Sequence, residues 1–221
     1  MTSVSSPAQD AAVEAARYAL LRRLAPSMRH HLVVNLQPIG MVYEIMDRRL
    51  RAPEPNLADV HDNAQKINSY AKAALASCLD VVTWLAPDES ATLTASEGVR
   101  ECLALVGTSF TFRGFTLRNE VGDVQGNVQR GAFRNVVTGA LVYLSDAREP
   151  PAEITVAAKA ASGGLEVVLA ARDGKGEPGF ATAPAYRPLT WADVEALARA
   201  DGVQLQREDA TLRLTLPWVA A

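Results

Sequence analysis

Residues 57–85 carry an unbroken heptad pattern, which constrains the fold more than any other feature of the sequence. Apolar or small side chains recur at alternating spacings of three and four, and this predicts a helix with one long contact seam. Many of these side chains are small, so a neighbouring helix can approach closely. The predicted seam consists of Leu57, Val60, Ala64, Ile67, Ala71, Ala74, Cys78, Val81 and Leu85.

A second helical pattern precedes the seam and covers residues 11–50. Pro26 and Pro38 interrupt it, and we expect them to bend or locally unwind the helix. Residues 51–56 form a break, with Asn56 as the N-cap of the next helix. The two helices predict an antiparallel hairpin. Because a lone hairpin cannot bury both of its faces, two copies are expected to pair into a four-helix bundle. The alternative is a hairpin that packs only against its own C-terminal domain.

After Pro87 the pattern changes to short β runs that alternate with helices. This order predicts an α/β sandwich with the helices on one face of a mixed sheet. The fold class is therefore α+β, with a helical hairpin domain at 1–87 and an α/β sandwich at 88–221. The expected helices are 96–110, 124–144 and 191–200, and the expected strands are 115–121, 154–160, 165–171, 203–206 and 211–216.

Composition narrows the functional classes. The chain has 22 basic and 25 acidic residues, so no basic surface for nucleic acid is expected. It has no apolar stretch of the ~20 residues that a membrane span needs, and residues 1–10 do not resemble a signal peptide. Cys78 and Cys102 read as buried free thiols, and the three histidines lack metal-ligand spacing. We therefore expect a cytoplasmic protein with no metal, no nucleic-acid partner and no membrane segment.

The adjacent histidines, His30 and His31, lie midway along the first helix. Such a pair is often only a solvated or partly packed feature of a helix. Here, however, residues 29–39 resemble the phosphoacceptor box of histidine kinases, in which His30 takes the place of the phosphoacceptor. The resemblance extends over nearly the whole chain, as a dimerising hairpin followed by an ATPase-type sandwich. The positions that match the box are His30, Leu32, Asn35, Leu36, Pro38 and Ile39.

Two positions in this box differ from the family. His31 stands where the family has an acid that orients the imidazole and takes up its proton. A neutral imidazole can accept a proton but supplies no fixed negative charge. Val34 stands where the family has an Asn or Thr that positions a hydrolytic water. The resemblance therefore implies phosphoryl transfer at His30 but not phosphatase activity.

The second domain resembles the histidine kinase ATPase fold with its nucleotide-binding residues replaced. Residues 135–141 resemble the N box, in which Asn135 retains the first asparagine and Gly139 replaces the one that holds magnesium. Glycine has no side-chain oxygen for a hard cation. Residues 185–190, at the second glycine box, contain no glycine. A degenerate first glycine box is formed by Asp173, Gly174 and Gly176, with Arg172 on the adenine-reading position. Its other interpretation is an ordinary glycine loop.

The sequence thus predicts a histidine phosphotransferase that relays a phosphoryl group between aspartate receiver domains through His30. His31 or a nearby backbone group would orient the ring, no cofactor would bind to this chain, and Mg²⁺ would come with the receiver. The expected partners are a second copy of the chain and the receiver domains of response regulators. One alternative is a weak or atypical ATP-dependent histidine kinase, and another is an inert dimeric scaffold that sequesters a response regulator. Candidates for receiver docking are Arg29, Leu32, Val33 and Leu36.

Overall fold

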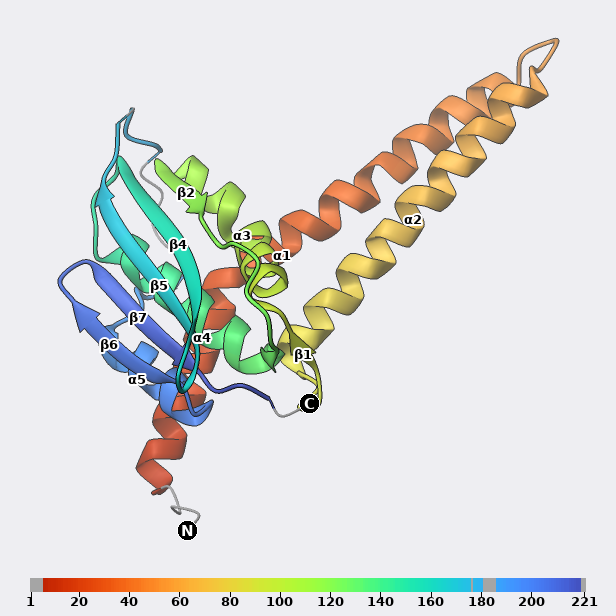
Figure 1. The fold of residues 1–221 in the computed structure, drawn as a ribbon. Helices are drawn as coiled ribbons and strands as arrows, with labels where there is room; N and C mark the ends of the chain where they lie inside the picture. The colour runs from red at the N-terminus through yellow and green to blue at the C-terminus, as the bar shows by residue number, and fades with distance from the viewer. Residues whose placement is uncertain (1–5, 176, 181–185, 220–221) are drawn as a thin grey trace. The chain divides into compact units, whose positions relative to one another are not determined.

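The computed structural model describes residues 6–175, 177–180 and 186–219, and it divides into two compact units (Figure 1). The hairpin unit is Pro26–Pro87. The sheet unit combines the chain up to Ala25 with Asp88–Ala221. The chain therefore passes between the units twice, once within its first helix and once after its second. The sequence predicted a first domain of residues 1–87, but the contacts group the residues before Pro26 with the sheet unit instead.

Helix α1 runs without interruption over Pro7–Leu50 and includes both prolines. The expected local unwinding at Pro26 and Pro38 is therefore not seen. Helix α2 covers Leu57–Leu85 and begins as predicted, because Oδ1 of Asn56 accepts a hydrogen bond from the Ala58 amide at 3.0 Å. None of the helices in the described parts of the chain combines the length and apolarity that crossing a bilayer requires.

The predicted seam of α2 is correct in alternate positions only. Val60, Ile67, Ala74 and Val81 are buried or half-buried, but Leu57 and the residues at 64, 71, 78 and 85 are exposed. Two contacts with α1, Asn35–Ser77 and Arg49–Asp59, lie along the covered side of α2. The exposed seam positions of α2 lie outside this covered side and are open to solvent in the single chain. The row that is covered consists of Val60, Asn63, Ile67, Tyr70, Ala74, Ser77, Val81 and Trp84.

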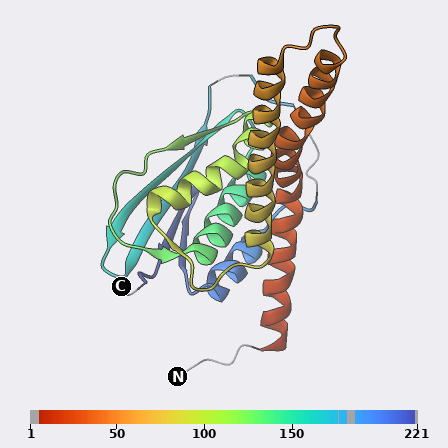
Figure 2. The same ribbon diagram turned by 90° about the vertical axis from the view of Figure 1, so that its right-hand side faces the viewer.

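The sheet unit contains a five-stranded sheet with three helices on one face (Figures 1 and 2). Its strands follow the order β2-β4-β5-β7-β6, with β2 and β4 parallel and the other pairs antiparallel. This architecture confirms the predicted α/β sandwich. The strands are β2 Phe115–Asn119, β4 Ala152–Ala161, β5 Gly164–Asp173, β6 Gln204–Glu208 and β7 Thr211–Leu216, and the helices are α3 Ala95–Phe112, α4 Arg130–Asp146 and α5 Trp191–Ala200.

Two of these helices begin at the capping boxes that their sequences encode. Thr94 starts α3 with Glu97 as its reciprocal partner, and Thr190 starts α5 with Asp193. Helix α4 begins at Arg130 and not at residue 124, so that boundary was predicted wrongly. The preceding residues form strand β3, Val128–Gln129, which pairs with β1, Thr92–Leu93. This pairing joins distant segments, and local periodicity does not reveal it.

Helix α4 is buried on almost every side. One side faces the sheet, where alternate strand residues such as Ile154, Leu169 and Leu214 form the core. The outer side of α4 is covered by the first part of α1, which runs along the helical layer in Figure 2. The residues of this part of α1 that are almost fully buried are Ala16, Ala19, Leu20 and Leu24.

Candidate functional site

The histidine pair lies in the hairpin unit and presents two different environments. His30 is exposed, whereas His31 is half-buried, because neighbouring positions on a helix point about 100° apart. Their ring centroids are 6.3 Å apart and the ring planes are tilted by 52°. At that separation the ring nitrogens of the two residues cannot form a direct hydrogen bond. An orienting effect of His31 on His30 thus stays a prediction and would need a different rotamer or a mediating group.

Asn35 fixes the backbone next to the pair. Its Nδ2 donates to the carbonyl oxygen of His31 and to Oγ of Ser77, each at 3.1 Å. The second bond joins α1 to α2 one turn after the histidines. Asn35 matched the phosphoacceptor box in the sequence, but its partner Ser77 was not identified, because no local pattern pairs residues 42 apart. Together they hold the helix that carries the imidazoles.

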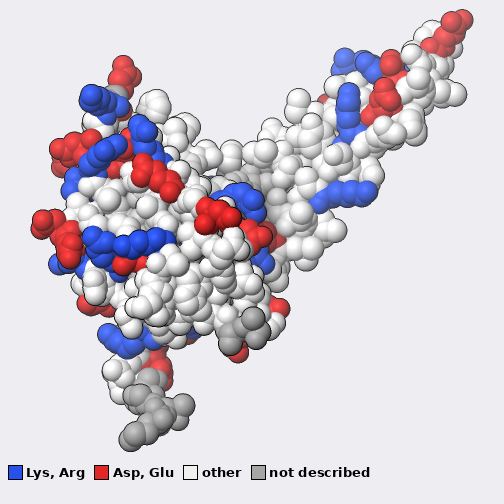
Figure 3. Space-filling view, in the orientation of Figure 1, with Lys and Arg blue, Asp and Glu red and all other residues white. Residues whose placement is uncertain are grey.

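Three of the four candidate docking residues are accessible. Arg29, Val33 and Leu36 are exposed, and the two apolar side chains keep 45% and 50% of their surface. Leu32 is half-buried. In Figure 3, charged side chains of the hairpin gather toward the end that carries the turn at 51–56, and much of the remaining surface in that view is uncharged. An accessible imidazole with apolar neighbours is a suitable surface for docking another protein.

The N-box residues do not line an open site. Asn135, Gly139 and Asp146 share one side of α4, because they are four and seven residues apart. We call this side the N-box face. Nδ2 of Asn135 donates to Oδ2 of Asp201, at the end of α5, at 3.1 Å. A Cβ added at Gly139 would lie 2.8 Å from Cδ1 of Leu197 and 4.0 Å from Cδ2 of Leu20.

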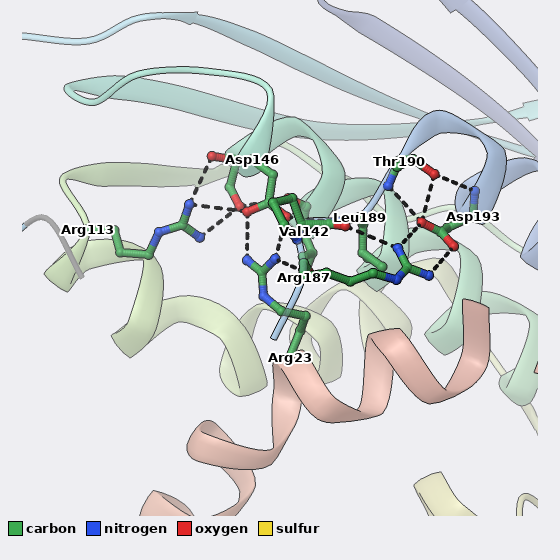
Figure 4. A network of polar contacts seen from close by, with 10 residues as sticks. Arg23, Arg113, Val142, Asp146, Arg187, Leu189, Thr190 and Asp193 are labelled. Carbon is green, nitrogen blue, oxygen red and sulfur yellow. Dashed lines mark hydrogen bonds and ion pairs between the residues drawn. The ribbon is translucent and has the colours of Figure 1, made fainter. Parts of the chain in front are cut away.

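At the end of the N-box face, Asp146 is the centre of a buried ionic network (Figure 4). Both of its oxygens accept hydrogen bonds from the Arg23 guanidinium at 2.6 Å. The Leu189 amide donates to Oδ2 at 3.0 Å, and Arg113 approaches Oδ1 at 3.4 Å. Burial lowers the pKa of Arg113, and its neighbour Asp146 opposes that effect. The network therefore joins α1, α3, α4 and the segment before α5.

A second ionic contact fixes the start of α5 (Figure 4). Arg187 donates to both oxygens of Asp193 at 2.7 and 2.8 Å, and Asp193 also accepts from the amide and hydroxyl of Thr190. The Arg187 hydrogen bonds lower the pKa of Asp193 to about 2. Residues 186–190 thus form a fixed helix start. Residues 181–185 lie outside the described residues, including position 185 of the expected second glycine box.

The first glycine box serves local packing. The Gly174 amide donates to the Pro151 carbonyl at 2.9 Å, and a Cβ at Gly174 would come within about 3.0 Å of the Ala152 backbone. Asp173 is fully exposed and contacts Arg148 at 3.3 Å. Gly176 lies outside the described residues. Arg172, on the expected adenine-reading position, pairs with Glu153 across the sheet. Arg172 and Asp173 are therefore the last residues of β5, and Gly174 packs against the start of β4.

The described residues contain no cluster of three or more His, Cys, Asp or Glu side chains that could hold a metal ion.

In this chain a helical hairpin is followed by a mixed five-stranded sheet. Helices cover one face of the sheet, and the helix with the N-box residues, α4, is among them. This arrangement of elements agrees with the one that the resemblance to a histidine kinase core predicts. No family model matches the sequence, and no curated protein matches it.

Several solved structures are similar to this chain. A histidine kinase from Burkholderia phymatum STM815 matches 98% of this chain and 100% of its own, at 13% identity and a TM-score of 0.45. A bacterial phosphotransferase matches 97% of this chain and 98% of its own, at 10% identity and a TM-score of 0.42. Histidine kinase ThkA, in complex with response regulator TrrA, matches 92% of this chain and 63% of its own, at 13% identity and a TM-score of 0.44.

Proposed function

We propose that this chain is a histidine phosphotransferase of a two-component pathway, which relays a phosphoryl group through His30 without binding nucleotide. The observation that carries the proposal is a contrast between two sites. Of the two imidazoles in the phosphoacceptor box, His30 is the exposed one, whereas the N-box face is covered by the chain's own helices. A triphosphate on that face would have to displace Leu20 and Leu197 and break the Asn135–Asp201 bond.

Phosphoryl transfer requires few chemical groups from this chain. A neutral ring nitrogen of His30 attacks the phosphorus of an aspartyl phosphate, the N–P bond forms, and the P–O bond to the aspartate breaks. The electron pair leaves with the aspartate carboxylate, and the other ring nitrogen of His30 keeps its proton. The reverse reaction delivers the group to the aspartate of a second receiver. Positioning provides most of the rate, because the phosphoryl group needs in-line geometry and little further covalent chemistry.

The receiver domain is the natural partner for this reaction, since it brings the aspartate and the Mg²⁺ that neutralises the phosphoryl oxygens. This chain would supply the imidazole and a docking surface around it. Arg29, Val33 and Leu36 are exposed near His30 and provide one cation and two apolar contacts. Leu32 would contribute through its half-exposed edge.

A second copy of the chain is the other expected partner. The row of α2 that faces away from α1 exposes large apolar side chains, among them Leu75, Leu79 and Val82, and α1 exposes Met41 and Ile45. Pairing of two hairpins into a four-helix bundle would bury such a surface, which supports the proposed dimer. A dimer would present two copies of His30 to receivers.

The test is transfer from a phosphorylated, radiolabelled receiver domain to the purified protein in the absence of ATP. We expect label on the wild type in an acid-labile and base-stable form, and none on His30→Gln. His61→Gln is the matched control, since His61 is also exposed but lies on α2 with Gln65 as its partner. Label on neither wild type nor control, across a panel of receivers, would refute the relay.

Two further results would favour other functions. Label that passes to His30 from ATP, with Mg²⁺, would identify an atypical kinase. Receiver binding that persists in His30→Gln, with no transfer to the wild type, would identify a scaffold. The proposed phosphotransferase is expected to show neither binding of Mg²⁺-ATP in a titration nor autophosphorylation.

A further inference from the structure

The helix that carries His30 begins inside the sheet unit, on the N-box face. We propose, on the basis of the function proposed above, that the sheet unit acts as a clamp on this helix. The unit binds Pro7–Ala25, the first part of α1, on the face that resembles the nucleotide side of the ATPase family, and thereby stabilises the helix that continues to His30. Arg23 is the central positioning residue of the clamp.

Contacts at three levels hold the segment. Arg17 reaches Asp201 at 3.4 Å, at the same carboxylate that accepts the Asn135 amide. One turn later Leu20 packs toward Gly139, and one turn after that Arg23 forms its two bonds with Asp146. Each of these α1 positions lies three residues after the one before it, so that neighbouring contacts are adjacent on the helix surface. The segment is thus bound along its length and not at a single point.

The Arg23–Asp146 ion pair is buried, and its loss should weaken the clamp. The two side chains are only 6% and 5% exposed, so water cannot replace either partner. Loss of Arg23 would leave the buried carboxylate with the Leu189 amide and the more distant Arg113. Removing one partner of a buried ion pair is strongly unfavourable, because the other charge stays desolvated.

The clamp lies close enough to His30 to affect it. Arg23 precedes His30 by seven residues, which is about two helical turns or ~10 Å. Between them lies Pro26, at the point where the chain leaves the sheet unit. Proline has no N–H, so the turn from Arg22 to Pro26 lacks one helical hydrogen bond. The order of residues 26–30 therefore depends on how firmly the residues before Pro26 are held.

The test is amide hydrogen exchange on the full chain, for wild type, Arg23→Gln and the control Arg22→Gln. Arg22 is exposed, and its guanidinium lies over the rings of Tyr18 and Tyr186 at 6.0 and 5.4 Å. In Arg23→Gln we expect exchange to rise about ten-fold or more in residues 16–24 and also in residues 26–34, since local opening sets exchange rates. Exchange in β4 and β5 should stay unchanged, which shows that the sheet unit is still folded. The control should resemble the wild type.

The matching kinetic readout is phosphoryl transfer from a labelled receiver. We expect Arg23→Gln to lower kcat several-fold with KM unchanged, because docking residues are untouched. Arg23→Lys, which keeps one charged contact, should fall between the two. Leu20→Ala tests the same segment without changing a charge and should raise exchange in the same two ranges.

The outcomes separate the clamp from the function on which it rests. Exchange that rises in residues 16–24 but not in 26–34, or that does not rise at all, would overturn the clamp. Unchanged kcat in a variant with raised exchange at 26–34 would overturn it as well. A wild type that accepts label from no receiver would refute the phosphotransferase, and exchange alone would then show whether the clamp controls residues 26–34.

Discussion

The side-chain amide of Asn135 donates a hydrogen bond to Oδ2 of Asp201, with nitrogen and oxygen 3.1 Å apart. Oδ1 of the same carboxylate is 3.4 Å from Nη2 of Arg17. Asn135, which matches the first asparagine of the N box in the resemblance, therefore joins α4 to α5, and through Asp201 to α1. At this position the side chain takes part in packing.

We predict that Asn135→Ala lowers the free energy of unfolding by about 1 kcal/mol, because it removes one hydrogen bond of a half-buried carboxylate. Denaturant unfolding measures the change. Transfer of label from a receiver to His30 should continue. Loss of transfer in a variant that unfolds at the wild-type midpoint would assign Asn135 a chemical role instead.

Gly139→Asn introduces the asparagine that histidine kinases have at their magnesium-holding position, but the N-box face leaves no room for its side chain. The new Cβ would lie 2.8 Å from Cδ1 of Leu197, so we expect a loss of roughly 1–3 kcal/mol from overpacking. The matched control is Gly107→Asn in α3, where a Cβ meets nothing within 4 Å. Titration with Mg²⁺-ATP should show no binding in either variant. Magnesium-dependent ATP binding by Gly139→Asn would contradict this account of the N-box face.

Asn63 lies in the covered row of α2, and its Nδ2 is buried with no hydrogen-bond partner among the described residues. We predict that Asn63→Leu raises the free energy of unfolding by roughly 1–2 kcal/mol, because an unsatisfied buried donor is removed. Asn68→Leu, at an exposed position of the same helix, is the control and should change stability little. A less stable Asn63→Leu variant would show that the amide is satisfied in solution.

A substitution of Leu79 tests the dimer proposal. This side chain is 57% exposed in the single chain. Leu79→Glu would place a charge in the middle of the expected bundle contact, and we expect monomers in light scattering after size exclusion. Lys66→Glu changes charge on another side of α2 and should stay dimeric. Dissociation by both variants, or by neither, would mean that this row is not the contact.

Asp193 makes stability depend on pH in acid. The hydrogen bonds from Arg187 are the main cause that lowers the pKa of Asp193 to about 2. The carboxylate therefore stays ionised in the folded state. The stabilisation is complete above about pH 4, where the unfolded carboxylate is ionised too, and is lost as the pH falls toward 2. Denaturant midpoints of wild type and Asp193→Asn should therefore differ at neutral pH and converge in acid. A constant difference across that range would show that the charge is not the cause.

Local patterns predicted most of the elements, because caps and hydrophobic periods are encoded within a few residues. Asn56, Thr94 and Thr190 begin helices through contacts to residues two or three positions away. Non-local contacts were the ones that the sequence did not reveal. The residues before Arg130 have helical periodicity, yet Val128 pairs with Leu93 in a strand.

The candidate site shows the same division. His30 and the departures at Gly139 and Arg172 were visible as motif positions. The cover on the N-box face was not, because a periodic helix does not specify its partner. Leu20 belonged to a helical pattern that fitted the hairpin equally well, and its contact near Gly139 spans most of the chain. The same ambiguity affected α2, where a heptad pattern could not show which of its rows meets α1.

The contact between Arg17 and Asp201 spans 184 residues. Residues of α1 that are synthesised early must therefore wait, during translation, for α5 to leave the ribosome before the N-box face can close. Contacts of such long range slow folding and leave apolar side chains unprotected in the nascent chain. The apolar side chains of Leu20 and Leu24 thus stay without their folded cover until synthesis of the sheet unit is nearly finished.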